Sequence, residues 1–73
     1  MRHAHLDNLL HAQPFWPFRV TLTNGNALEI RHPEFFMLLS GTVIIGHPEA
    51  GEAGDLFTIV DLSHIAEAVP WPL

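Results

Sequence analysis

In FRVTLTNGNALEIR, residues 18–31, apolar and polar residues alternate on both sides of an Asn-Gly pair. A period of two is the signature of a half-buried β-strand, and Asn-Gly between two such runs is typical of a β-hairpin. The stretch therefore predicts two antiparallel strands joined by a tight turn.

The register of this hairpin is set by the length of its loop. A two-residue loop at Asn24-Gly25 would place Val20 opposite Glu29 and mix the buried and exposed faces, which a half-buried strand does not tolerate. A three-residue loop that begins at Thr23 and ends with Gly25 in the left-handed conformation matches apolar residues with each other and pairs opposite charges. The resulting pairs are Val20–Leu28, Phe18–Ile30 and Arg19–Glu29.

A short helix precedes the hairpin. Residues 3–12 contain Leu6, Leu9 and Leu10 at the i, i+3 and i+4 spacing of an amphipathic helix. The helix must end before Pro14, because proline disfavours helical geometry at the residue before it. A helix this short is not stable alone, so we expect its apolar face to pack against the strands.

Further strands follow the hairpin. Pro33 ends or bends the second strand, because proline cannot donate to a β-ladder. FFMLL (35–39) and TVII (42–45) predict a second hairpin around Ser40-Gly41. A polar loop at GHPEAGEAG (46–54) is followed by a strand at DLFTIVDL (55–62). Ser63-His64 predicts a short turn, at most one turn of 3₁₀ helix, before a closing strand at IAEAV (65–69).

One helix and five or six short strands with tight connections predict the fold class. A flat sheet of this size would leave its faces and edges uncovered. We therefore expect a mainly β single domain (1–73), a small open SH3-like or Sm-like barrel of antiparallel strands. Its parts are an N-terminal helix region (1–13), the barrel (18–69) and an extended tail (70–73).

Length and composition limit the class of protein. The 73 residues, 48% of them hydrophobic, suffice for one domain with a small core. No run reaches the roughly 20 apolar residues of a transmembrane helix, and MRHAHLDNLL lacks the apolar segment and cleavage site of a signal peptide. We expect a cytoplasmic protein without membrane contact. Because the chain has no cysteine, oligomerisation is the expected further source of stability.

Charge argues against nucleic-acid binding. The chain has no lysine, its three arginines all lie within the first 31 residues, and its net charge is −5. Affinity for a phosphate backbone comes largely from Lys and Arg side chains that displace counterions. Nucleic acid is therefore an alternative partner that the charge disfavours.

Two segments resemble a known family. LLHAQPFWPFRVTLTNGNALEIRHPEFF (9–36) and VDLSHI (60–65) are similar to a family of short, uncharacterised bacterial proteins. Its members carry a P-F-x-P-F opening, an N/D-G hairpin, an R/P-H-P-E-F segment and a terminal D-L-x-x-I stretch. The resemblance spans residues 9–69 and implies no particular activity. Of the two His-Pro-Glu tripeptides, only the one at 32–34 belongs to the family pattern.

More distantly, the chain resembles the Sm-like fold, in which an N-terminal helix precedes a strongly bent five-stranded barrel that assembles into rings and binds RNA. VTLTNG (20–25) with FFMLL is similar to the first half of the Sm pattern, and VDLSHIAEAV (60–69) to its closing strands. The second-strand glycine, the aspartate that holds bases and the basic second motif are absent. An Sm-like RNA-binding protein that stacks bases on Phe35, Phe36 or Trp16 is the main alternative function.

The repeated His-Pro-Glu raises the question of a metal site. A metal site needs three or four convergent ligands, and the candidates are His32, His47 and His64 with Asp61 or Glu34. We interpret the tripeptides as strand ends and expect no cofactor, so a histidine-based metal-binding module is the second alternative. Asp61 and His64 have a D-x-x-H spacing, but no nucleophile with its base and no pair of catalytic carboxylates accompanies them. We therefore expect no enzyme activity.

Aromatic residues point to the function. Trp16 and Trp71 each adjoin proline, and Phe35 and Phe36 add aromatic surface. Trp and Phe are enriched at protein interfaces and anchor binding there. Together with the edges of a small sheet, these four residues predict a non-enzymatic interaction module that self-associates as a dimer or a ring.

Overall fold

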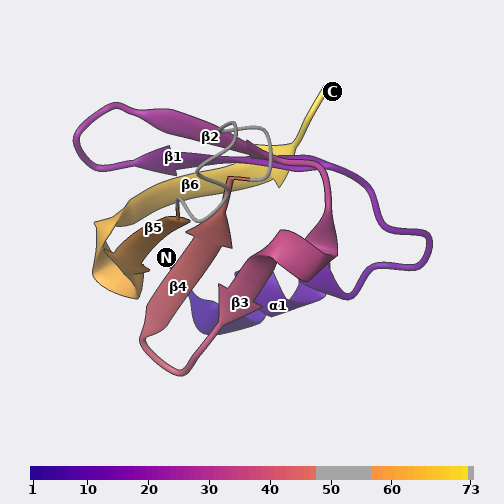
Figure 1. Ribbon diagram of the computed structural model, residues 1–73, viewed down its shortest axis with the longest axis horizontal. Helices are drawn as coiled ribbons and strands as arrows, with labels where there is room; N and C mark the ends of the chain where they lie inside the picture. The colour runs from indigo at the N-terminus through magenta and orange to yellow at the C-terminus, as the bar shows by residue number, and fades with distance from the viewer. Residues whose placement is uncertain (48–56, 73) are drawn as a thin grey trace.

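The structure is a computed structural model that describes residues 1–47 and 57–72. In that part of the chain it contains one α-helix, six β-strands and two 3₁₀ helices (Figure 1). A mainly β chain with a short N-terminal helix is thus confirmed. The elements are α1 His3–Leu10, β1 Phe18–Leu22, β2 Ala27–Ile30, η1 Pro33–Phe35, β3 Phe36–Leu38, β4 Thr42–Gly46, β5 Phe57–Asp61, η2 Leu62–His64 and β6 Ile65–Pro70.

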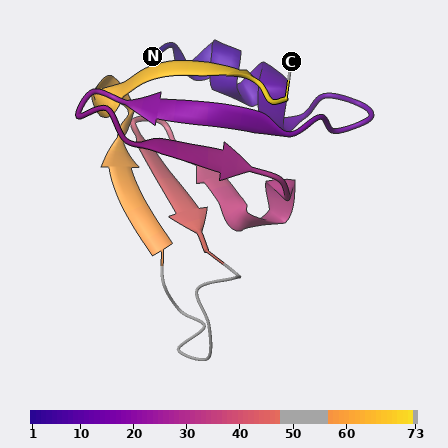
Figure 2. The ribbon, with the colours of Figure 1, turned by 90° about the horizontal axis from the view of Figure 1, so that it is seen from above.

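The strands form two antiparallel sheets of three strands each, with orders β2-β1-β6 and β3-β4-β5 (Figure 2). The described strands therefore form neither a closed barrel nor one continuous bent sheet. Pro33 begins η1 between β2 and β3, and η2 separates β5 from β6. Proline has no N–H to donate and each 3₁₀ turn redirects the chain, so neither ladder continues across these points.

The first hairpin has the predicted register. Phe18 lies opposite Ile30 and Val20 opposite Leu28, and the N–H of Leu22 donates to the Asn26 carbonyl at 2.8 Å. Gly25 adopts the left-handed conformation with φ 91°, which is open to glycine without strain. The three-residue loop is therefore confirmed.

The other elements agree with the sequence except at their ends. The second hairpin joins β3 to β4, but Phe35 belongs to η1 rather than to the strand. The predicted 3₁₀ turn is η2. The helix ends at Leu10, before the predicted residue 12, and β6 runs to Pro70 and pairs with β1. Most of the predicted 46–54 loop and the first two residues of the predicted 55–62 strand lie outside the described residues.

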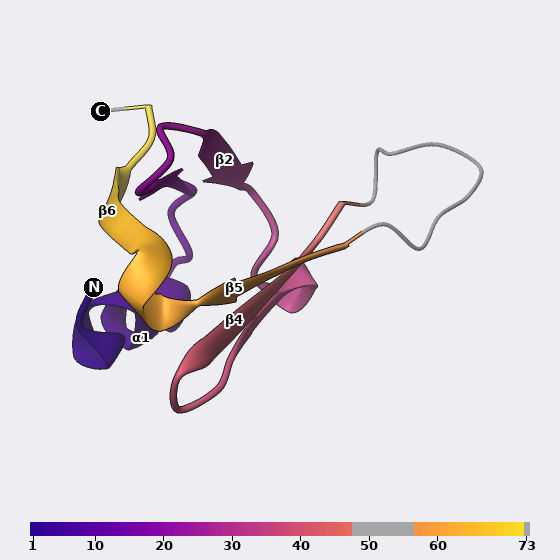
Figure 3. The ribbon, with the colours of Figure 1, turned by 90° about the vertical axis from the view of Figure 1, so that its left-hand side faces the viewer.

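The core lies between the two sheets and the helix (Figure 3). Leu6 of α1 is fully buried, and Leu9 and Leu10 pack against the core, so the predicted apolar face of the helix is confirmed. A ring nitrogen of His5 also contacts the Ala68 carbonyl of β6 at 2.8 Å. The buried residues are Leu6, Phe18, Val20, Ile30, Phe36, Val43, Ile45, Val60, Ile65 and Ala68. Within the described residues, no helix has the length and apolar character needed to cross a bilayer.

Candidate interaction surface

One face of the β3-β4-β5 sheet is both apolar and exposed. Side chains alternate along these strands, and every second one, such as Val43 and Val60, points into the core. In the described part of the chain six large apolar side chains are exposed, and all but Trp16 lie on or beside the opposite face. These five, with their exposed fractions, are Phe35 (41%), Met37 (55%), Leu39 (45%), Phe57 (57%) and Ile59 (61%).

The register makes this face continuous. Met37 of β3, Ile44 of β4 and Ile59 of β5 lie directly opposite one another and form a row across all three strands. In a second row, Gly46 lies opposite Phe57, and a methyl group placed at Gly46 would be 3.5 Å from the Phe35 side chain. We call the surface made by Phe35, Met37, Leu39, Ile44, Phe57 and Ile59 the outer face.

The outer face carries charge only at one end among the described residues. Thr42 lies opposite Asp61 in the row next to Met37 and Ile59, where β5 ends. The hydroxyl and the N–H of Ser63 donate to Asp61 Oδ1 at 2.7 and 2.9 Å. These hydrogen bonds hold the pKa of the Asp61 carboxyl below its ordinary value, so it is ionised at neutral pH.

Most outer-face residues were not predicted as interface residues. FFMLL, TVII and FTIV are apolar at every position or nearly so, and such runs are typical of strands buried on both faces. Among the described residues, other parts of the chain cover only one face of these strands. The continuous apolar runs were the signal that could have identified Met37, Ile44 and Ile59.

The four predicted interface residues differ in exposure. Trp16 is exposed in the connection before β1, and Phe35 is exposed on the outer face. Phe36 is only 5% exposed and belongs to the core, so in this chain it offers neither an interface surface nor a platform for base stacking. Trp71 is half-buried, and the Arg19 guanidinium lies 4.6 Å from the centre of its ring.

The candidate metal ligands are placed at two separate points. His32 and His47 border one pocket, and the ring of His47 contacts the Thr58 hydroxyl at 2.7 Å. His64 belongs to η2, where Asp61 binds Ser63. Among residues 1–47 and 57–72, no three His, Asp or Glu side chains gather in an arrangement that could hold a metal ion. Pro48 and Glu49 of the second tripeptide lie outside the described residues.

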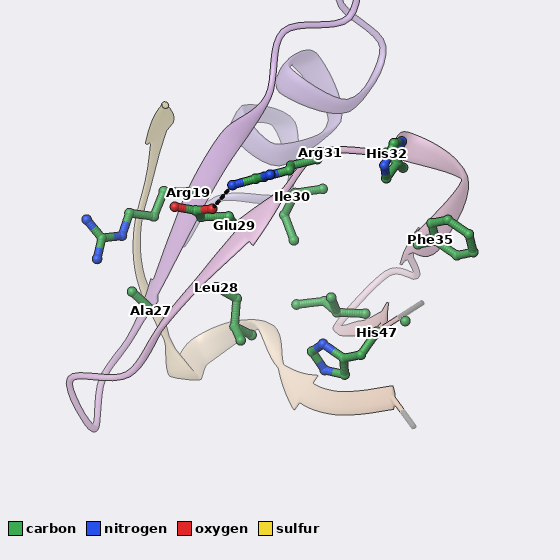
Figure 4. Close-up of a pocket in the computed structure, with 11 residues that line it drawn as sticks. Arg19, Ala27, Leu28, Glu29, Ile30, Arg31, His32, Phe35 and His47 are labelled. Carbon is green, nitrogen blue, oxygen red and sulfur yellow. Dashed lines mark hydrogen bonds and ion pairs between the residues drawn. The ribbon is translucent and has the colours of Figure 1, made fainter. Parts of the chain in front are cut away.

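A pocket of about 660 Å³ lies between β2, η1 and the end of β4 (Figure 4). Its acidic side chain, Glu29, accepts a hydrogen bond from Arg31 at 2.8 Å, which holds the pKa of the Glu29 carboxyl below its ordinary value. The other lining residues combine basic and apolar side chains. The full lining is Arg19, Ala27, Leu28, Glu29, Ile30, Arg31, His32, Phe35, Ile45, Gly46 and His47.

Comparison with known proteins identifies no relative of this chain. No protein-family model, no curated protein and no solved structure matches it. The features that bear on its function are therefore the geometry of the outer face and of the pocket beside β2.

Proposed function

We propose that the chain is a non-enzymatic interaction module that self-associates, with two copies burying their outer faces against each other. The observation that carries this proposal is that five of the six exposed large apolar side chains in the described residues share one sheet face. The largest apolar patch on a typical monomer is about 300–600 Å², and it is often a functional surface. Removing such a surface from water is favourable by about 25 cal/mol per Å².

The area of the outer face supports a second copy as the partner. If one large apolar side chain exposes on the order of 150 Å² when fully free, the five partly exposed side chains together offer on the order of 400 Å². A standard interface buries about 800 Å² on each partner, a little more than half of it apolar. The outer face thus supplies most of the apolar area that one side of such an interface needs.

A two-fold arrangement fits the distribution of charge. Two sheets that pack face to face lie about 10 Å apart with their strands nearly aligned. If the strands of the two copies run antiparallel, Ile44 lies near the centre and the two ionised Asp61 carboxylates lie at opposite ends. An interface of this kind uses the same patch on both copies and closes as a dimer.

Strand edges contribute less to this proposal than the face does. Two of the four edge strands, β3 and β6, contact α1. The edge strand β2 carries an exposed ion pair between Glu29 and Arg31. Charged side chains on an edge oppose pairing with an apolar strand.

We also propose that the two sheets are the halves of an open barrel of SH3-like or Sm-like type. The strand orders β6-β1-β2 and β3-β4-β5 support this, because the chain passes directly from β2 through η1 to β3. The single 3₁₀ turn between β5 and β6, and the antiparallel pairing of β6 with β1, also support it.

Sedimentation equilibrium of the untagged protein tests self-association. We expect a mass of twice the 8.2 kDa chain at about 100 μM, because the area buried by two outer faces, less the cost of association, corresponds to a dissociation constant on the order of micromolar. A single-chain mass at all concentrations up to about 1 mM would overturn the proposal.

A further inference from the structure

The pocket beside β2 follows the open edge of that strand. Six consecutive residues, 27–32, line it. In Figure 4, Leu28 and Ile30 point toward the side of β2 on which Phe35 and His47 lie, whereas Glu29 and Arg31 meet on the other side. Successive side chains of a strand point to opposite faces, so a pocket lined by consecutive residues borders the main chain itself.

The main chain of β2 has groups that point into this open side. Leu22 donates to Asn26, which makes these two residues a hydrogen-bonded pair of the β1-β2 ladder. In an antiparallel ladder such pairs alternate with pairs whose N–H and C=O groups point away from the partner strand. Ala27 and Glu29 therefore direct both groups away from β1. Within the described residues, β2 pairs with β1 alone, and no main-chain hydrogen bond of Ala27 or Glu29 on the open side is made.

Among the described residues, the charged side chains around this edge are mostly basic, although the chain as a whole is acidic. Two of the three arginines and two histidines line the pocket, although the chain as a whole has a net charge of −5. The acidic side chain, Glu29, accepts from Nη2 of Arg31. A guanidinium has five N–H donors and the Arg31 side chain is largely exposed, so it retains donors for a second carboxylate.

We propose that the edge of β2 is a peptide-binding site, where an extended acidic segment of a partner protein adds a fourth strand to the β2-β1-β6 sheet. The N–H and C=O groups of Ala27 and Glu29 pair with the segment, and Arg31 binds one of its carboxylates. Its apolar side chains enter the pocket on the side to which Leu28 points. A small anion could use the N–H groups but would leave the outward carbonyls without donors, so the geometry favours a strand.

Titration of the ¹⁵N-labelled protein with the peptide acetyl-Val-Glu-Val-Glu-Val-Glu-amide tests this proposal. We expect the amide signals of Ala27, Glu29 and Arg31 to shift with a dissociation constant on the order of 0.1–1 mM, and the Ala27 and Glu29 amides to exchange more slowly with solvent. The matched peptide with lysine in place of glutamate should bind at least about fivefold more weakly. Absence of shifts at about 5 mM acidic peptide, or equal affinity for the lysine peptide, would overturn the proposal.

A second arm separates strand pairing from anion binding. The same acidic peptide N-methylated at alternate residues keeps its charge but loses strand hydrogen bonds, and we expect about tenfold weaker binding. Ala27→Pro removes only an outward N–H of β2, and edge strands tolerate proline at such a position. We expect this variant to bind the unmodified peptide about as weakly as the wild-type chain binds the N-methylated peptide. If the N-methylated peptide bound the wild-type chain as tightly as the unmodified peptide, the site would bind anions without strand pairing. That result would contradict the proposal even if Ala27→Pro did not fold.

A pair of charge variants locates the carboxylate contact. Arg31→Gln should weaken binding of the acidic peptide about two- to fivefold, because an exposed ion pair contributes modestly. Arg2→Gln removes the same charge before α1, outside the pocket lining, and should leave the affinity unchanged. Equal effects of the two variants would mean that only net charge matters and would contradict a carboxylate contact at Arg31.

Discussion

Replacing Phe18 with alanine is expected to lower the free energy of unfolding by about 3–5 kcal/mol. The Phe18 side chain is fully buried, and its ring makes edge-to-face contacts with Phe15 and Phe36 at centroid distances of 6.0 and 5.5 Å. It thus joins the two sheets and the segment before β1. A chain of 73 residues has about 4–11 kcal/mol of stability in total, so the variant should lose much of its folded population at room temperature.

Urea unfolding followed by circular dichroism measures this loss, with all samples at one protein concentration because dimerisation adds to apparent stability. Trp16→Ala is the control, since this aromatic side chain is exposed and its removal should change stability by about 0.5 kcal/mol or less. A loss below about 1 kcal/mol in Phe18→Ala would mean that Phe18 is not the centre of the core.

Replacing Ile59 with glutamate is expected to raise the dissociation constant of the dimer at least about 100-fold. Ile59 is 61% exposed in the single chain and lies on the edge strand β5, so the variant should still fold. In the proposed dimer each copy would bury this carboxylate against an apolar face whose own charge, Asp61, is also negative. Because the interface is two-fold symmetric, the free-energy cost of burying the carboxylate arises twice in each dimer.

The control for this variant is Gln13→Glu, which adds the same charge at an exposed residue before β1. Sedimentation equilibrium compares both variants with the wild-type chain. We expect Gln13→Glu to remain dimeric and Ile59→Glu to sediment as a single chain at about 100 μM, given a micromolar wild-type dissociation constant. A dimer of undiminished stability in Ile59→Glu would place the contact between copies on another surface.

The elements that the sequence predicted best are those set by local rules. The register of the β1-β2 hairpin follows from the alternation around Asn24-Gly25, and a shift by one residue would turn every side chain to the wrong face. The helix follows from the spacing of its leucines, although its C-terminal end lies two residues earlier than expected. Such features depend on neighbours in sequence and need no knowledge of the rest of the fold.

The orientation of the later strands could not be predicted in the same way. Phe35 and Phe36 are adjacent and equally apolar, so the pattern does not say which one faces the core. In the structure Phe36 is buried and Phe35 lies on the outer face, because Phe36 pairs with Ile45 on the side that meets the other sheet. Which residues form the outer face therefore depends on the tertiary structure, although the apolar runs indicate that such a face exists.

The two-sheet arrangement and the pocket beside β2 also depend on distant parts of the chain. The sequence predicted a bend at Pro33, but it did not predict that the strands divide into two separate ladders, with β6 paired to β1. The pocket is lined by both Arg31 and His47, which follow strands of different sheets. Their spacing in the sequence does not predict that they line one pocket, because each residue belongs to a different local sequence pattern.

Contacts between two copies at the outer face are the most direct test of the proposed dimer. An isotope-filtered nuclear Overhauser experiment on an equal mixture of ¹³C-labelled and unlabelled chains reports only contacts between copies. The proposed dimer predicts signals from the methyl groups of Met37, Ile44 and Ile59 of one copy to the same three residues of the other. A sample in which these signals are absent, or in which contacts between copies arise from Trp16 and β6 instead, would contradict it.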